Sequence, residues 1–173
     1  MTAADALTLF RALAGIPIVF ALALNGRAFA LALFAVAALS DALDGWLARR
    51  SGTVTDHGAI LDPLADKAVV LATLAGLSLV GGVPLPLAVA IAARELLVSG
   101  LRVLRYRGGE PLPASPAAKV KTALEMCGIA VLIVAPRSGS EAVLGLVLLG
   151  TALVISAVTL PVYVPRKRQR YTT

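Results

Sequence analysis

Four aspartates in a 26-residue segment are the side chains of this sequence most suited to chemistry. Asp41 and Asp44 have i, i+3 spacing, which places both on one face of a helix. Asp62 and Asp66 have i, i+4 spacing, which does the same on a second helix. Carboxylate oxygens, with no Cys or His at a matching spacing, favour Mg²⁺ or Mn²⁺ over zinc or copper. Because four carboxylates match the charge of two such ions, the segment predicts a two-metal site suited to phosphoryl transfer.

Small residues beside the acids leave room for a substrate. Gly45 and Ala48 share the helix face of Asp41 and Asp44, so a bulky group can approach the backbone there. Without cations the cluster would be unfavourable, because two carboxylates about 5.5 Å apart at an effective dielectric near 20 repel by about 3 kcal/mol. We therefore expect divalent ions and a substrate to share this site.

The rest of the chain is apolar enough to lie in a membrane. Of the 173 residues, 58% are hydrophobic and 15% are charged, and the mean hydropathy is +0.87. A soluble domain averages about 25% charged residues. We predict a single all-α integral membrane domain over residues 1–173, ending in a basic cytoplasmic tail at 165–173. Since one crossing takes roughly 20 helical residues, we expect six transmembrane helices, at about 7–24, 28–48, 59–80, 84–105, 117–135 and 141–164.

The basic residues orient these helices. With the N-terminus in the cytoplasm, twelve of the sixteen Lys and Arg residues fall on the cytoplasmic side, and only Arg27 and Arg137 fall on the other. The positive-inside rule therefore predicts a multi-pass protein of the cytoplasmic (inner) membrane. Both termini and the four aspartates are expected on its cytoplasmic side. This topology accounts for the net charge of +6, and we expect no nucleic-acid partner.

The aspartate segment resembles the signature of the CDP-alcohol phosphatidyltransferase family. Residues 41–66 read D-x2-D-G-x2-A-R-x8-G-x3-D-x3-D, without a gap or mismatch. The resemblance implies a six-helix membrane enzyme, commonly a homodimer, that displaces CMP from a CDP-linked substrate with the help of two Mg²⁺ or Mn²⁺ ions. It implies that Asp66 ligates one ion and acts as the general base on the acceptor hydroxyl. The metal ligands it implies are Asp41, Asp44, Asp62 and Asp66.

The same resemblance implies a binding pocket for the cytidine diphosphate. The residues it implies are Thr8, Arg11, Gly45, Ala48, Arg49 and Gly58. Three further segments are similar to bacterial phosphatidylglycerophosphate synthases: "DALTLFR" at 5–11, "ARELLVSGLR" at 93–102 and "AKVKT" at 118–122. Asp5, Ala118 and Glu125 stand where those enzymes usually have Asn, Gly and Gln. These likenesses imply transfer of the phosphatidyl group of CDP-diacylglycerol to glycerol 3-phosphate.

Glycerol 3-phosphate is a dianion, so its pocket requires fixed positive charge. Arg94 lies inside a predicted span, where ionisable side chains are costly and usually functional. Arg102, Lys119 and Lys121 flank the boundary at which the aspartates are expected. We predict that these four side chains bind the acceptor phosphate, with Arg105 as a further candidate. The alternative roles are pairing with another buried group, for Arg94, and topology or contact with lipid headgroups, for Arg105.

Two other hypotheses remain open from the sequence. The first keeps the chemistry and changes the acceptor to inositol phosphate, or to phosphatidylglycerol in a cardiolipin-type reaction. A lipid acceptor has less need of a basic pocket, whereas inositol phosphate is anionic as well. The second is a cation transporter with the aspartates as its ion site, although such sites usually lie near the bilayer midplane on broken helices.

Overall fold

The computed structural model describes the backbone of residues 3–51, 58–107 and 115–163, and the side chains of 13–40, 67–105, 115–161 and 163. These residues form α-helices and one short 3-10 turn, with no strand among them. The elements are α1 (Ala3–Ala23), α2 (Arg27–Ser51), α3 (Gly58–Leu79), α4 (Leu85–Arg107), α5 (Pro116–Val134), α6 (Ser140–Val158) and the 3-10 turn η1 (Leu160–Val162). The all-α prediction is confirmed for this part of the chain.

Each expected span corresponds to one helix, with one clear difference at the C-terminal end. We expected the last span to reach about residue 164, but α6 ends at Val158. The Thr159 hydroxyl donates to the carbonyls of Ile155 and Ser156, at 2.9 and 3.1 Å. Pro161 then lies in the 3-10 turn, and its lack of an N–H prevents the α-helical ladder from continuing.

The apolar length of the helices supports the membrane prediction only in part. Among the described residues, α6 alone combines the length and composition of a membrane span, with a mean hydropathy of 2.2 and 28% of that window buried. Shorter apolar stretches are Leu13–Ala23, Arg27–Ser40 and Lys67–Leu79. Large apolar side chains also face outward, as at Leu79, which is 81% exposed. The count of six crossings therefore stays a prediction.

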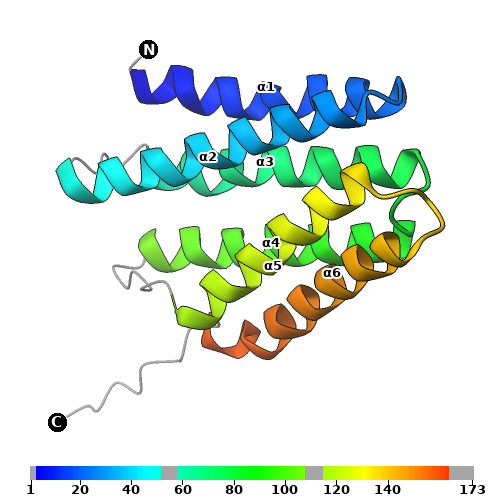
Figure 1. Cartoon of the computed structure of the whole chain (residues 1–173). Coiled ribbons are helices and arrows are strands. Elements are labelled where there is room, and N and C mark those ends of the chain that lie inside the picture. The colour runs from blue at the N-terminus through cyan, green and yellow to red at the C-terminus, as the bar shows by residue number, and fades with distance from the viewer. Residues whose placement is uncertain (1–2, 52–57, 108–114, 164–173) are drawn as a thin grey trace, which may run out of the picture.

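Successive helices run in opposite directions, so the loops collect at two ends of the molecule (Figure 1). The turns α1–α2, α3–α4 and α5–α6 lie at one end. The start of α1, the end of α2, the start of α3, the end of α4 and the start of α5 lie at the other. This arrangement brings the helix ends with the predicted aspartates to the same end as Arg102 and Lys121 (on α4 and α5).

Two close helix contacts hold the apolar core together. Helix α1 packs on α3 and α5 packs on α6. A Cβ on Gly15 would lie 2.4 Å from Ala72 Cβ, and one on Gly145 would lie 2.5 Å from Leu132 Cγ, so a side chain fits at neither glycine without displacing its neighbour. Small residues let the backbones approach closely, as is common between membrane helices. Around these contacts the buried core includes Ile18, Leu22, Val70, Leu74, Leu77, Ile129, Ile133 and Leu149.

We call the end of the molecule with the turns α1–α2, α3–α4 and α5–α6 the turn end. Two arginines there bind the carbonyl ends of helices. The Arg27 guanidinium donates to the carbonyls of Val134 and Ala135, where α5 ends. Arg137 Nε donates to the Val80 carbonyl at 2.6 Å, just after α3. The last carbonyls of a helix lack partners within it and carry the negative end of the helix dipole. Both arginines therefore cap helices far from them in the sequence.

Candidate functional site

The four aspartates lie on two neighbouring helices at one end of the molecule. Asp41 and Asp44 belong to the last part of α2, and Asp62 and Asp66 to the first part of α3. Residues 52–57 connect these two helix ends, which lie at the same end of the bundle (Figure 1). All four side chains fall outside those that the structure describes, so the metal-ligand assignment stays a prediction. By their chemistry, four carboxylates fit hard divalent ions such as Mg²⁺ and Mn²⁺.

The residues predicted to bind the cytidine diphosphate follow the same pattern. Their backbones lie in α1, α2 and α3, and their side chains are likewise outside the described set. These residues are Thr8, Arg11, Gly45, Ala48, Arg49 and Gly58. Helix α1 packs against both α2 and α3, so all six positions belong to helices in mutual contact. Their roles remain predictions.

The structure describes the side chains of a second polar centre, built around the buried carboxylate of Glu95 on α4. Glu95 is 2% exposed. Its Oε2 lies 2.6 Å from Lys67 Nζ on α3, and its Oε1 lies 2.8 Å from Nη1 of Arg94. The same Oε1 accepts from Nζ of Lys121 on α5, which also pairs with Glu125. One carboxylate thus gathers three cations from three helices.

The neighbours of this centre are held by further polar contacts. Nη2 of Arg94 donates to the Ser156 carbonyl on α6 at 3.3 Å. Lys121 is 4% exposed and Glu125 1% exposed, so their ion pair is buried. Buried charges are tolerated when they are paired and hydrogen-bonded in this way. The centre is therefore a rigid network at the junction of α3, α4, α5 and α6.

A groove opens beside this network. About 320 Å³ of empty space is bounded by Lys67, Arg94, Glu95, Val98, Ser99, Arg102, Ala118, Lys121, Thr122 and Tyr163. At one wall, Arg102 donates through Nη2 to the Tyr163 hydroxyl at 3.2 Å, and its guanidinium carbon lies 5.2 Å from the centre of the Tyr163 ring. This stacking restricts the long Arg102 side chain to the groove wall.

The groove has an excess of positive charge. Among the side chains that the structure describes, four cations and one carboxylate line it, a net charge of +3. Glu125, which pairs with Lys121 from outside the groove, reduces the total to +2. A phosphate monoester in its dianionic form would neutralise that total. Arginine guanidinium and lysine ammonium groups are both donors that bind phosphate oxygens.

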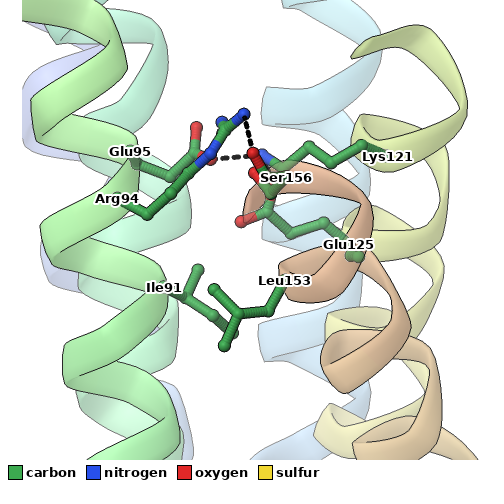
Figure 2. Close-up of a pocket in the computed structure, with 8 residues that line it drawn as sticks. Ile91, Arg94, Glu95, Lys121, Glu125, Leu153 and Ser156 are labelled. Atoms are coloured by element: carbon green, nitrogen blue, oxygen red, sulfur yellow. Dashed lines mark hydrogen bonds and ion pairs between the residues drawn. The ribbon is translucent and has the colours of Figure 1, made fainter. Parts of the chain in front are cut away.

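Behind the groove lies a smaller recess between α4, α5 and α6 (Figure 2). Figure 2 shows Arg94, Glu95 and Lys121 together on one side of it, and Ile91 and Leu153 closing the other. The recess has about 170 Å³ of empty space, and Oε1 of Glu125 and Oγ of Ser156, both buried, have no hydrogen-bond partner among the described residues. The side chains of Ile91 and Leu153 form the apolar floor of this recess.

The predicted acceptor-phosphate residues divide into two groups. The structure brings Arg94, Arg102 and Lys121 together along the groove. Lys119 is exposed and does not line it, so its role stays a prediction. Sequence reasoning missed Lys67, although a lysine inside an apolar span was a signal that could have identified it. It also missed Thr122 and Tyr163, which carry no such signal because hydroxyl groups are common in helices.

Comparisons with known proteins identify the family of this chain. The chain matches the CDP-alcohol phosphatidyltransferase family across residues 1–162. A Mycobacterium tuberculosis protein named "Probable phosphatidylglycerophosphate synthase" is 40% identical over 140 residues, which cover 81% of this chain and 66% of that protein. Proteins named "CDP-diacylglycerol--glycerol-3-phosphate 3-phosphatidyltransferase" are similar too. The Rickettsia bellii protein is 38% identical over 118 residues (66% of this chain, 64% of its own length), and the Bacillus subtilis protein 37% over 101 (58% and 52%). The chain therefore spans just under two thirds of the first of these relatives and about half of the last.

Proposed function

We propose that this chain, which belongs to the CDP-alcohol phosphatidyltransferase family, is an enzyme that transfers the phosphatidyl group of CDP-diacylglycerol to glycerol 3-phosphate. The products are phosphatidylglycerophosphate and CMP. The names of the curated relatives support this donor and this acceptor. The class of reaction is transfer of a substituted phosphate group, which is also the chemistry for which the aspartate segment is suited.

The charge of the groove is the observation that carries the choice of a phosphomonoester as acceptor. After Glu95 and Glu125 are counted, the described side chains of the groove carry a net charge of +2, which suits a small dianion from the cytoplasm. Arg94, Arg102 and Lys121 bind its phosphate, and Lys119 contributes from outside the groove. An acceptor such as phosphatidylglycerol, with one phosphodiester charge, would leave part of this charge unneutralised. The groove thus favours a phosphomonoester over a cardiolipin-type reaction.

Inositol phosphate carries the same dianionic group, so the groove charge does not separate it from glycerol 3-phosphate. The names of the relatives favour glycerol 3-phosphate. A cation transporter is disfavoured by the family to which the chain belongs.

Asp41, Asp44, Asp62 and Asp66 would hold two divalent ions, Mg²⁺ or Mn²⁺, and the family's general use of divalent ions supports this. When bound, such ions neutralise the diphosphate and make the acceptor hydroxyl more acidic. Asp66 accepts the proton of that hydroxyl, whose oxygen attacks the phosphorus that carries the lipid. Thr8, Arg11, Gly45, Ala48, Arg49 and Gly58 bind the cytidine diphosphate, and their positions on the aspartate-bearing helices and the adjacent α1 support this assignment.

The setting of this reaction is the cytoplasmic membrane, crossed six times. The long apolar α6 and the outward-facing apolar side chains support membrane contact. The excess of basic residues on the side predicted to be cytoplasmic supports a cytoplasmic site. This geometry lets the donor lipid enter from the bilayer while the acceptor arrives from water. A homodimer is part of the same proposal and has the family resemblance as its support.

Parallel transfer assays with different acceptors test the choice of acceptor directly. The purified protein in detergent is given CDP-diacylglycerol, Mg²⁺ or Mn²⁺, and radiolabelled glycerol 3-phosphate, inositol phosphate or phosphatidylglycerol in parallel. We expect CMP release and label in the lipid fraction with glycerol 3-phosphate. Label entering lipid only from inositol phosphate, or CMP release only with phosphatidylglycerol, which is itself a lipid, would contradict the choice of acceptor. No CMP release with any of them would contradict the reaction class.

A further inference from the structure

Glu95 holds its three cations to different degrees. Arg94 has a second anchor in the Ser156 carbonyl, and Lys121 has one in Glu125. Among the side chains that the structure describes, the ion-pair partner of Lys67 is Glu95. Loss of the Glu95 carboxylate would therefore leave Arg94 and Lys121 tied to other groups, while Lys67 would lose its tie to α4. The contact that depends on Glu95 most is therefore its ion pair with Lys67, which joins α3 to α4.

This contact lies at a position where the two proposed substrate sites meet. Lys67 follows Asp66 directly on α3, and Glu95 lies on α4 at the wall of the groove. Deeper in the bundle, α3 and α4 contribute apolar residues such as Val70, Leu74 and Ile91 to the core. Apolar contacts have little directional preference, whereas an ion pair at 2.6 Å fixes the relative position of two helices.

We infer that Glu95 is a positioning residue, which through Lys67 holds the aspartate-bearing part of α3 in a fixed place relative to the acceptor groove. The inference rests on the proposed function, because it joins the proposed general base to the proposed phosphate site. Its consequence is specific. The acceptor still binds when the tie is broken, since Arg94, Arg102 and Lys121 remain, but its hydroxyl is no longer aligned for transfer.

Substitution of Glu95 by Gln separates binding from turnover. The amide keeps the size of the side chain and removes one negative charge from the groove, so attraction for the phosphate is not reduced. We expect E95Q to lower kcat by at least about tenfold, since small misplacements at a reacting centre cost up to about a hundredfold. The KM for glycerol 3-phosphate should stay within about threefold of the wild type, and calorimetry without divalent ions should show similarly preserved binding.

Substitutions of Lys67 test the same tie from the other helix. K67M should reproduce the loss of kcat, and K67R, which keeps a cation that can pair with Glu95, should retain most of it. The E95Q/K67M double variant should be no slower than the slower single variant by more than about threefold, because both break one contact. E125Q is the matched control: it also removes a buried carboxylate from Lys121, but it leaves the Lys67–Glu95 pair intact. It should leave kcat within about threefold of the wild type.

The outcomes separate this inference from the proposed function. A wild-type protein that transfers nothing to glycerol 3-phosphate contradicts the proposed function itself. With an active wild type, multiplying losses in the double variant, equal loss of kcat in E125Q and E95Q, or failure of K67R to retain activity would overturn the role of Glu95. If E95Q does not fold, as judged by its thermal unfolding in detergent, the contrast between K67M and K67R decides the question alone.

Discussion

The cations at the two ends of the molecule have different partners. At the turn end, Arg27 and Arg137 donate to backbone carbonyls where α5 and α3 end. At the other end, Lys67, Arg94 and Lys121 meet the carboxylates of Glu95 and Glu125 beside a groove. In the first region each cation completes the hydrogen bonding of a helix. In the second, cations outnumber carboxylates next to open space.

This difference shows which cations are available to a ligand. A guanidinium bound to helix carbonyls already interacts with the negative end of a dipole, and a ligand would have to displace that contact. Around Glu95 the network holds the cations in place, and the described side chains there carry a net charge of +2. A basic side chain is therefore available to bind a ligand when it lies beside a cavity and nearby carboxylates do not balance its charge. The residue type alone does not decide this.

The largest effect on turnover is expected for Asp66, the proposed general base, at the end of the molecule that contains the groove. Asp66→Asn should lower turnover by at least about a hundredfold, because a positioned base contributes about 10²–10⁴-fold. The protein should still fold and insert, since Asn has nearly the same size. CMP release from CDP-diacylglycerol measures turnover, and thermal unfolding in detergent is the control. Activity above about a tenth of the wild type would contradict the role of Asp66.

The next effect concerns Lys121. In an E125Q background, which avoids leaving a buried carboxylate unpaired, Lys121→Ala should raise the KM for glycerol 3-phosphate at least about tenfold over E125Q alone. A hydrogen bond to a charged group contributes about 1.5–3 kcal/mol, and about 1.4 kcal/mol corresponds to tenfold in affinity. The KM for CDP-diacylglycerol should change little. Equal increases in both KM values would remove Lys121 from the acceptor site.

A smaller effect is expected for Arg102, which is exposed and stacked on Tyr163. Arg102→Ala should raise the KM for glycerol 3-phosphate about two- to fivefold, since exposed charge pairs contribute about 0.2–1 kcal/mol. Lys119→Ala is the matched control on the same basic surface, and outside the groove its effect should be smaller. Steady-state kinetics at fixed salt compares the two. A larger effect for Lys119 would show that the phosphate lies outside the groove.

The smallest effect on activity is expected at the turn end. Arg27→Ala and Arg137→Ala should leave kcat and both KM values within about twofold of the wild type, because neither side chain lies near the groove. Each should lower the unfolding temperature in detergent by a few degrees, since about 1 kcal/mol corresponds to roughly 2–4 °C for a chain of this size. A change in KM for glycerol 3-phosphate without a change in unfolding temperature would break the comparison between the two ends.

Much of the fold could be predicted from local patterns. Long apolar stretches and Gly-containing turns predicted a helix in each expected span, because helix formation depends on residues close in sequence. The end of α6 at Val158 was missed, since the chain after it is still apolar and the 3-10 turn depends on Thr159 and Pro161. The spacing of the aspartates predicted a site because it repeats with the period of a helix.

By itself, the sequence determined that four aspartates lie on two successive helices, and it assigned Arg94, Arg102, Lys119 and Lys121 to one phosphate site. Only the tertiary structure decided which carboxylates the cations meet. Glu95 contacts Lys67 and Lys121, each more than 25 positions away, and their meeting depends on how α3, α4 and α5 pack. Ionic attraction acts through space between side chains, so no pattern along the chain could identify which cations remain unmatched beside the groove.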